Sequence, residues 1–476
     1  MTSAEYNTSD KQAADTSATL AARMDRIPMT RRHRKVAVVV AAGTFFDAFD
    51  SLVLGVALTA IAASLGQGML GTGLLISSGY LGQFLGALVI GAVADRIGRR
   101  QAFLIAITVF SLLSLACAFA WSLEALTVAR LLQGIGLGAE TPVAAILISE
   151  YAPARRRGRA VMLYQAVFAW GVFAAPLAGL AVFAVVEPDV AWRVLFALGV
   201  LPLLIVLLAR HVLPESARWL MSKGRLDQAE RIVVQFEDAA TRDNKHLPAP
   251  ERRDDASPTA PTRLAEIFSP AYRTRTMLNG TLWFTTYFVT YGYAVWLPSL
   301  YVSIGGLQIS ESLYLTLAVA SAQLIVVYLF ALTVDRLGRR PTLIAGYTVA
   351  ITGAVVGLAM VQAGLTGWPT LFAAGLLIAI GCYVPAAGLF LYIPELYPTR
   401  IRGWGTSAGS SMNRLASVIA PTVVGWLLAS GFGLGAVFAM FAVVLLIGLA
   451  AMVRWGVETK ERSLEETSEE MSDGST

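Results

Sequence analysis

The chain has 476 residues, of which 56% are hydrophobic and only 14% are charged. Soluble domains carry about 25% charged residues because their surface must be hydrated, so this composition excludes an ordinary soluble protein. The net charge of +5 would suggest a nucleic-acid partner for a soluble protein, but here the placement of the charges matters more than their sum, and we expect no nucleic acid.

Twelve apolar stretches are long enough to cross a bilayer. A spanning helix needs about twenty predominantly apolar residues, because the hydrocarbon core is about 30 Å thick and each residue rises about 1.5 Å. The sequence therefore predicts an all-α membrane protein with twelve transmembrane helices. The expected spans cover residues 36–63, 71–93, 101–121, 124–148, 160–186, 192–211, 276–302, 312–333, 341–362, 368–393, 404–430 and 434–456.

The spans form two groups of six, separated by one long polar connection. Residues 36–211 are the predicted N-terminal bundle and residues 276–456 the C-terminal bundle. Between them, residues 212–275 are rich in charged residues and proline, which indicates a cytoplasmic linker with short helices. Residues 1–35 and the acidic residues 457–476 are expected to be solvated cytoplasmic tails.

Positive residues gather in the loops of one side. The loops at residues 64–70, 303–311, 363–367 and 431–433 contain no Lys or Arg, whereas the alternate loops are rich in arginine. Arg193 is the exception. Because positive residues favour the cytoplasmic side, we expect both termini to be cytoplasmic.

Two motifs occur once in each group of six spans. DRIGRR at residues 95–100 follows the second span, and DRLGRR at residues 335–340 follows the eighth, about 240 residues later. Glu150 and Glu395 each begin a second motif, in which Glu, Pro, Arg and Gly keep their spacing. This repetition predicts two pseudo-symmetric six-helix bundles related by an axis along the membrane normal, with the substrate site between them.

These motifs resemble those of the major facilitator superfamily, and the resemblance covers residues 35–466. GAVADRIGRR at residues 91–100 is similar to the superfamily's loop between the second and third helices. PESARWL at residues 214–220 resembles a signature of sugar porters and organic-ion transporters, and residues 457–466 resemble the sugar-porter C-terminal signature. The resemblance implies the major facilitator fold and a transporter that works by alternating access.

Shorter segments resemble particular branches of the superfamily. AETPV at residues 139–143 and YGY at residues 291–293 are similar to segments of bacterial niacin-type and other metabolite–proton symporters. Residues 47–50 resemble the DGxD element of aromatic acid–proton symporters, with Ala48 in place of glycine.

Acids in the spans are candidates for proton coupling, because a charge in hydrocarbon costs several kcal/mol and is rarely kept without a function. Asp47 and Asp50 share a helix face, and two close carboxylates do not both ionise readily in a low dielectric. We expect one of them, with Asp50 preferred, to carry a proton; a satisfied structural pair is the alternative. Glu140 is the second candidate, and Arg130 is expected to organise the core or assist coupling.

Arg414, next to Asn413, lies near the middle of the eleventh span. A guanidinium keeps its proton, so it must meet an acid or an anionic ligand. The second half offers no acid deep in its spans, which leaves the substrate or an acid of the first half: Asp47, Asp50 or Glu140. Related organic-anion transporters carry an arginine at a similar position. We therefore interpret Arg414 as the binding residue for a substrate anion, with an internal ion pair as the alternative.

Aromatic residues concentrate in the seventh span, where helical spacing would place several of them along a cavity for a planar substrate. The alternative is a lipid-facing or interfacial position. Predicted lining residues are Trp283, Phe284, Tyr287 and Tyr291, with polar lining from Tyr164, Gln165, Gln323 and Tyr392.

The charged loop motifs predict a cytoplasmic gate. Asp95 and Asp335 end their helices, where they can accept hydrogen bonds from arginines. Such a network would hold one face shut; charges that only set the topology are the alternative. The predicted gate residues are Asp95, Arg96, Arg99, Arg100, Glu150, Arg157, Asp335, Arg336, Arg339, Arg340, Glu395 and Arg402.

The resulting hypothesis is proton-coupled symport of a small organic anion, an aromatic or other carboxylic acid. A sugar or polyol porter, a proton-driven efflux antiporter and a membrane sensor are the alternatives. We expect a monomer in the bilayer of a bacterial inner membrane, since the short loop at residues 64–70 lacks the large insertion of animal organic-ion transporters.

No nucleotide loop, metal cluster or nucleophile arrangement is present in the sequence, so we expect no enzyme activity, no cofactor and no metal. Cys117 and Cys382 lie in apolar runs and are expected to be buried, without forming a disulfide framework.

Overall fold

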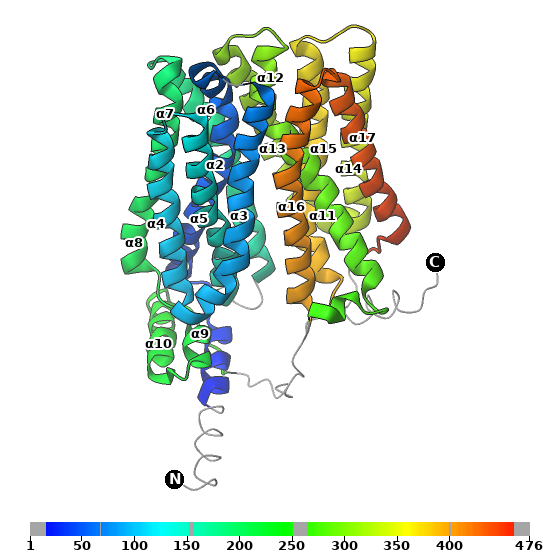
Figure 1. Ribbon diagram of the computed structural model, residues 1–476. Coiled ribbons are helices and arrows are strands. Elements are labelled where there is room, and N and C mark those ends of the chain that lie inside the picture. Colours follow the sequence, from blue (N-terminus) through cyan, green and yellow to red (C-terminus); the bar gives the residue numbers. More distant parts are fainter. Residues whose placement is uncertain (1–15, 67, 152–156, 251–263, 399–400, 461–476) are drawn as a thin grey trace.

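The computed structural model describes residues 16–66, 68–151, 157–250, 264–398 and 401–460, with the side chains of residues 91–92, 149 and 157–165 left out of the description. All regular structure in these ranges is helical. Figure 1 shows two groups of long helices side by side, which follow one another in the chain. The predicted all-α fold with two bundles is confirmed.

The first bundle contains six spans, the last of which is divided. Its helices are α2 (Arg31–Leu65), α3 (Met69–Ile97), α4 (Arg99–Ala118), α5 (Leu123–Tyr151), α6 (Arg157–Phe183), α7 (Pro188–Ala197) and α8 (Pro202–Val212), with the 3-10 turn η2 (Leu198–Val200) between the last two. Pro202 begins α8, where its missing N–H interrupts the hydrogen bonding of the sixth span.

The second bundle repeats this arrangement, with the divided span first. Its helices are α11 (Arg273–Ala294), α12 (Leu297–Ser303), α13 (Ile309–Leu337), α14 (Arg339–Gln362), α15 (Trp368–Glu395), α16 (Arg402–Ala429) and α17 (Gly433–Trp455). Within the described ranges, eleven helices are long and apolar enough to cross a membrane. The remaining predicted span, residues 276–302, consists of α11 and α12 together.

Helices outside the spans lie at the end of the molecule that carries the arginine-rich loops, called here the arginine-rich end. α9 (Ala217–Ser222), α10 (Leu226–Arg242) and a helix at residues 16–26 lie below the first bundle, and η3 (Leu264–Phe268) precedes the second (Figure 1). Leu20 and Met24 share an apolar cluster with Phe236 of α10. Glu237 accepts hydrogen bonds from Arg23 at 2.7 Å and Arg26 at 2.6 Å. The N-terminal segment, expected to be a solvated tail, is therefore partly a docked helix.

Close helix packing fixes the interior of the first bundle. α3 lies against α5, and a Cβ built on Gly138 would be only 1.9 Å from the carbonyl oxygen of Gln83. Only glycine permits this approach of α5 to the main chain of α3. The site-facing residues of α3 are consequently held at a fixed distance from those of α5.

Candidate functional site

Four of the five predicted intramembrane charges lie buried in the first bundle. Asp47 and Asp50 belong to α2, Arg130 and Glu140 belong to α5, and none of the four is more than 5% exposed. Arg414 of α16, in the second bundle, is partly exposed. The acids and Arg414 therefore belong to different halves of the molecule.

Asp50 forms a buried ion pair with Arg130. Arg130 Nη1 donates to Asp50 Oδ2 at 2.7 Å, and Gln133 Nε2 donates to Asp50 Oδ1 at 2.8 Å. The same Arg130 nitrogen donates to Gln133 Oε1 at 2.8 Å, which closes the network. Breaking a buried pair by removing one partner typically costs about 3–5 kcal/mol. This geometry favours Asp47 and Glu140 over Asp50 as proton acceptors.

Asp47 and Glu140 lie near each other with few hydrogen bonds. Asp47 Oδ2 accepts from Thr141 Oγ1 at 3.2 Å. Neither carboxylate oxygen of Glu140 has a hydrogen-bond partner among the described residues, and a Cβ on Gly43 would lie 2.5 Å from Glu140 Oε1. Asp47 and Glu140 interact electrostatically with each other, and both do so with Arg414. A buried carboxyl group without a partner is favoured in its protonated form.

Arg414 reaches across to the first bundle. Its Nη1 donates a hydrogen bond to Oε1 of Gln83 on α3, a residue that the sequence analysis did not select. Asn413 turns to its own helix, where its Oδ1 accepts from Ser417 Oγ at 3.2 Å. Of the two neighbours, Arg414 faces the junction of the bundles.

A column of aromatic rings rises along α11 beside this junction. The Trp283 and Tyr287 rings stack at 5.2 Å between centroids, and the Tyr287 and Tyr291 rings at 5.8 Å. Tyr80 of α3 continues the column at 4.7 Å from Tyr291, and its buried hydroxyl has no partner among the described residues. Tyr287 and Tyr291 both interact electrostatically with Arg414. The column thus presents aromatic surface next to a cation.

Other predicted lining residues are placed elsewhere or not placed at all. The prediction for Tyr392 is wrong in location, because its hydroxyl bonds the main-chain N and O of Val457, each at 3.0 Å, at the arginine-rich end. Phe284 packs on Phe288 at 5.6 Å, and Gln323 is buried in α13. The side chains of Tyr164 and Gln165 lie outside the described residues.

The first-half loop motif is held by an acid from after the sixth span. Asp95 pairs with Arg99 at 2.5 Å, and Glu215 Oε1 accepts from the main-chain N of Arg100 at 3.0 Å. Gly98, between them, has φ +104, and a Cβ there would collide with Glu215. Burial raises the pKa of the nearby Glu150 carboxyl. The side chain of Arg157 lies outside the described residues.

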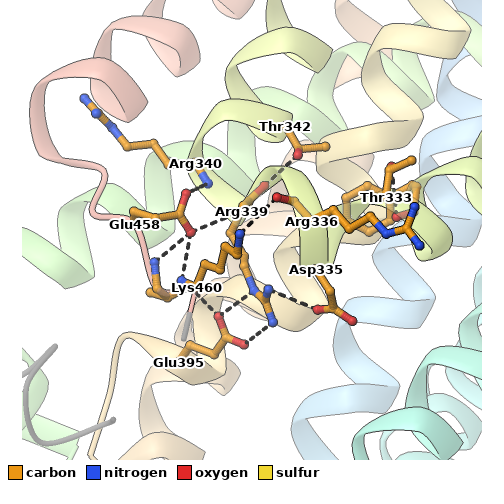
Figure 2. A network of polar contacts seen from close by, with 12 residues as sticks. Thr333, Asp335, Arg336, Arg339, Arg340, Thr342, Glu395, Glu458 and Lys460 are labelled. Atoms are coloured by element: carbon orange, nitrogen blue, oxygen red, sulfur yellow. Dashed lines mark hydrogen bonds and ion pairs between the residues drawn. The ribbon is translucent and has the colours of Figure 1, made fainter. Parts of the chain in front are cut away.

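Figure 2 shows the corresponding network of the second half. Arg339 pairs with Asp335 at 3.0 Å and with Glu395 at 3.3 Å. Glu458 accepts from the main-chain N of Arg339 at 2.9 Å and of Arg340 at 3.1 Å, and the second of these bonds corresponds to that from Arg100 to Glu215 in the first half. The C-terminal segment therefore caps the second copy of the motif.

Three further gate residues donate to main-chain carbonyls of their own half. Arg100 donates to the Arg210 carbonyl at 2.8 Å, and Arg340 donates to the Val453 carbonyl at 2.9 Å. Arg402 donates to the carbonyl of Tyr397 at 3.4 Å. The contacts described above for Asp95, Asp335 and the arginines at residues 99, 100, 339 and 340 each stay within one bundle. Arg96 and Arg336 are the other predicted gate residues of the two loop motifs. The ion pairs found here stabilise each half rather than a closed face between halves.

Contacts between the bundles run from the middle to the arginine-poor end. α3 packs against α16, and α6 against α13. Ser77 Oγ and Thr422 Oγ1 are 2.7 Å apart on the first seam, and Trp170 Nε1 donates to the Tyr328 hydroxyl at 3.0 Å on the second. Of the polar contacts found along the α3–α16 seam, the one between Gln83 and Arg414 lies nearest the arginine-rich end. The site between the acids, the arginine and the aromatic column lies at this inner limit.

Comparison with known proteins gives a consistent result. Residues 36–471 match the family model described as "Sugar (and other) transporter". The niacin transporter NiaP of Acinetobacter baylyi is 32% identical, covering 94% of this chain and 99% of the relative, and a gallate transporter of Pseudomonas putida is 33% identical, covering 83% and 85%. The xylose transporter XylE of Escherichia coli, in a partially occluded inward-open structure, aligns with a TM-score of 0.72 at 18% identity, covering 90% and 99%.

Proposed function

The chain belongs to the sugar (and other) transporter family of the major facilitator superfamily, a family of transporters rather than enzymes, and we propose that it carries a small organic anion together with protons by alternating access. The proposed substrate class is an aromatic or other carboxylic acid. The proposed location is a bacterial inner membrane, with the arginine-rich end and both termini in the cytoplasm and the protein acting as a monomer.

The observation that carries this proposal is the placement of Arg414. It is a permanent cation at the junction of the bundles, and its hydrogen-bond partner there, Gln83, is neutral. A guanidinium binds a carboxylate through two parallel charge-assisted hydrogen bonds, so this charge suits an organic acid. The adjoining rings of Tyr287 and Tyr291 provide a surface for a planar group. Niacin and gallate, named for two relatives, are both aromatic carboxylic acids.

Protons would enter through the acids that face Arg414. In the empty carrier, the Asp47 carboxyl group serves as an electrostatic partner of Arg414. A substrate carboxylate that takes over this role leaves Asp47 without its counter-charge, which favours proton uptake by Asp47 or Glu140. One anion and at least one proton would thus cross together, and neutralised acids would let the bundles change state around the loaded site without an unpaired buried charge.

The structure fits an inward-facing stage of this cycle, since the contacts between bundles occupy the arginine-poor half. In this proposal the arginine-rich loops move as two units, each held by its own carboxylate cap. They would approach each other when the carrier opens to the other side. The predicted cytoplasmic gate remains a proposal for that second state.

Uptake of radiolabelled nicotinate and gallate into proteoliposomes tests the function. An alkaline interior should accelerate uptake and drive accumulation above equilibrium, and Arg414→Ala should abolish saturable uptake. Faster uptake with an acidic interior would indicate antiport instead. Retention of wild-type affinity by Arg414→Ala would remove the anion site from the proposal.

A sugar or polyol porter is the second candidate, favoured by the description of the family model. The same vesicles distinguish it: saturable xylose uptake without acid uptake would replace the organic-anion assignment. The fixed charge of Arg414 argues against it, because a neutral sugar would leave that charge without an anion.

A further inference from the structure

In the contact between Gln83 and Arg414, the main chain of Gln83 is held firmly by its packing against α5. Gln83 is 3% exposed, and its main chain is pressed by α5 at Gly138 and Gly134. Its amide therefore projects from a fixed point of the first bundle toward α16, where Oε1 accepts from Arg414. A flexible surface contact would lack this support.

The chemistry of this contact differs from that of Arg130, the arginine buried in the first bundle. Arg130, whose partner lies in its own half, bonds a carboxylate of Asp50. Arg414, whose partner lies in the opposite half, bonds the neutral amide of Gln83. An ionised acid at residue 83 would pair with Arg414 and join the two halves by an ion pair, whereas an amide satisfies one donor and leaves the guanidinium free to bind a substrate anion.

We propose that Gln83 is a positioning residue of the transport cycle: its amide holds Arg414 in the empty carrier and gives way to the substrate carboxylate. This inference rests on the proposed function. A carboxylate offers two charge-assisted bonds to the guanidinium, against the single acceptor of the amide, so the substrate displaces Gln83. On release the amide returns, and the empty carrier can reorient without an unbonded buried donor.

Substrate binding thereby breaks the hydrogen bond between Gln83 and Arg414, the polar contact of the α3–α16 seam nearest the arginine-rich end. The Ser77–Thr422 contact farther along the seam involves no charge and no group of the site, so it does not respond to the substrate. Gln83 is thus the point at which occupancy of the site is communicated to the junction of the bundles.

Two substitutions in proteoliposomes test this role, with net uptake and counterflow exchange measured separately for whichever of nicotinate and gallate the wild type carries. Gln83→Met keeps the side-chain length and removes the acceptor. Exchange should persist with a half-saturation concentration lower by about fivefold, because the substrate no longer has to displace the hydrogen bond between Gln83 and Arg414. Net uptake should fall by about the same factor, because the empty carrier without this bond reorients slowly. Gln83→Leu replaces it if the Met variant does not reach the membrane.

Gln83→Glu should lower both exchange and net uptake by about tenfold or more at neutral pH, because a carboxylate competes for Arg414 with two charge-assisted bonds. Activity should return at acidic pH as the introduced carboxyl is protonated. Ser77→Ala, which removes the other seam contact, is the matched control and should leave the ratio of net uptake to exchange at the wild-type value.

An unchanged ratio in both apolar Gln83 variants, or wild-type behaviour of Gln83→Glu, would overturn the role of Gln83. If the wild type carries no organic acid, or Arg414→Ala keeps its affinity, the proposed function fails and this inference with it. If Ser77→Ala lowered the ratio of net uptake to exchange as much as the Gln83 variants do, loss of any contact along the α3–α16 seam would be sufficient. That result would also overturn the specific role of Gln83.

Discussion

Two buried acids of the same core have opposite surroundings. Both oxygens of Asp50 accept hydrogen bonds, one of them from a guanidinium, whereas the oxygens of Glu140 have no such partner among the described residues. Solvation by fixed donors holds a carboxylate ionised, and its absence in an apolar site favours the neutral acid. This difference supports the proposal that Asp50 has a structural role and Glu140 carries a proton.

Glu140→Gln should uncouple transport at the level of this single residue. The amide has nearly the shape of the protonated acid and cannot release a proton, so counterflow exchange should persist while accumulation driven by a pH gradient is lost. Glu124→Gln, an exposed acid near the start of the same helix, should behave as wild type. Proton-driven accumulation by the Glu140 variant would exclude Glu140 as the essential proton carrier.

The charges and the aromatic column of the site were predicted from the sequence, but its amides, Gln83 and Gln133, were not. Arg414, Asp47 and Glu140 stand out because charge is rare in spans. Gln83 and Gln133 carry the same signal more weakly, since an amide in an apolar helix also needs a partner. Tyr392 was misplaced because an isolated tyrosine does not reveal which end of a helix it serves.

At the scale of elements, the predicted spans correspond to the helices, but the division of the seventh span was not predicted. α11 ends at Ala294, and α12 begins at Leu297 just before Pro298. Trp296, between them, donates to the carbonyl of Pro421 on α16 at 3.1 Å. Pro298 interrupts the hydrogen bonding of the span, and the contact of Trp296 with a residue far along the chain fixes the break against α16, which periodicity in a single segment does not show.

The carboxylate caps of the loop motifs should determine the stability of each turn. Glu458 accepts from two main-chain N–H groups at the start of α14, and charged hydrogen bonds contribute about 1.5–3 kcal/mol each. Glu458→Gln should therefore lower the free energy of unfolding by about 2–3 kcal/mol and speed hydrogen exchange at the amides of residues 339 and 340.

Mass spectrometry of deuterium uptake in detergent would measure this change. Glu311→Gln removes an exposed carboxylate at the opposite end of α13 and should leave exchange at residues 339 and 340 unchanged. Equal protection in the two variants would mean that Glu458 does not hold the turn.

At the scale of the whole molecule, the repeated motifs were enough to predict two related bundles, while the state of the junction was not predictable. Both states of an alternating carrier share every residue and differ by only a few kcal/mol. The packing of Gly73 against the carbonyl of Pro421, where a Cβ would lie 3.0 Å away, is a property of the state and not of either bundle.

A larger side chain at that glycine should shift the equilibrium between states. Gly73→Leu would separate α3 from α16 at the arginine-poor end and favour the opposite opening. The thiol-labelling rate of Ser410→Cys, an exposed position on α16 one turn before Arg414, should then fall several-fold. The native Cys117 and Cys382 are buried and give little background.

Gly435→Leu is the matched control, because a Cβ at Gly435 of α17 meets only side chains, the nearer at 3.4 Å. The thiol-labelling rate of the double variant Gly435→Leu, Ser410→Cys should match that of Ser410→Cys alone. A similar rate in the Gly73 variant would show that the seam does not set the state.

The two carboxylate caps can form only after long stretches of the chain have been synthesised. Glu215 closes a turn whose Arg100 emerges from the ribosome 115 residues earlier, and Glu458 closes the equivalent turn at Arg339 after a lag of 119 residues. Each half therefore inserts its second, third and sixth spans before its loop motif acquires its anchor. The same order holds in both halves, because in each the anchoring glutamate follows the last span and can reach its loop motif only after that span has been made.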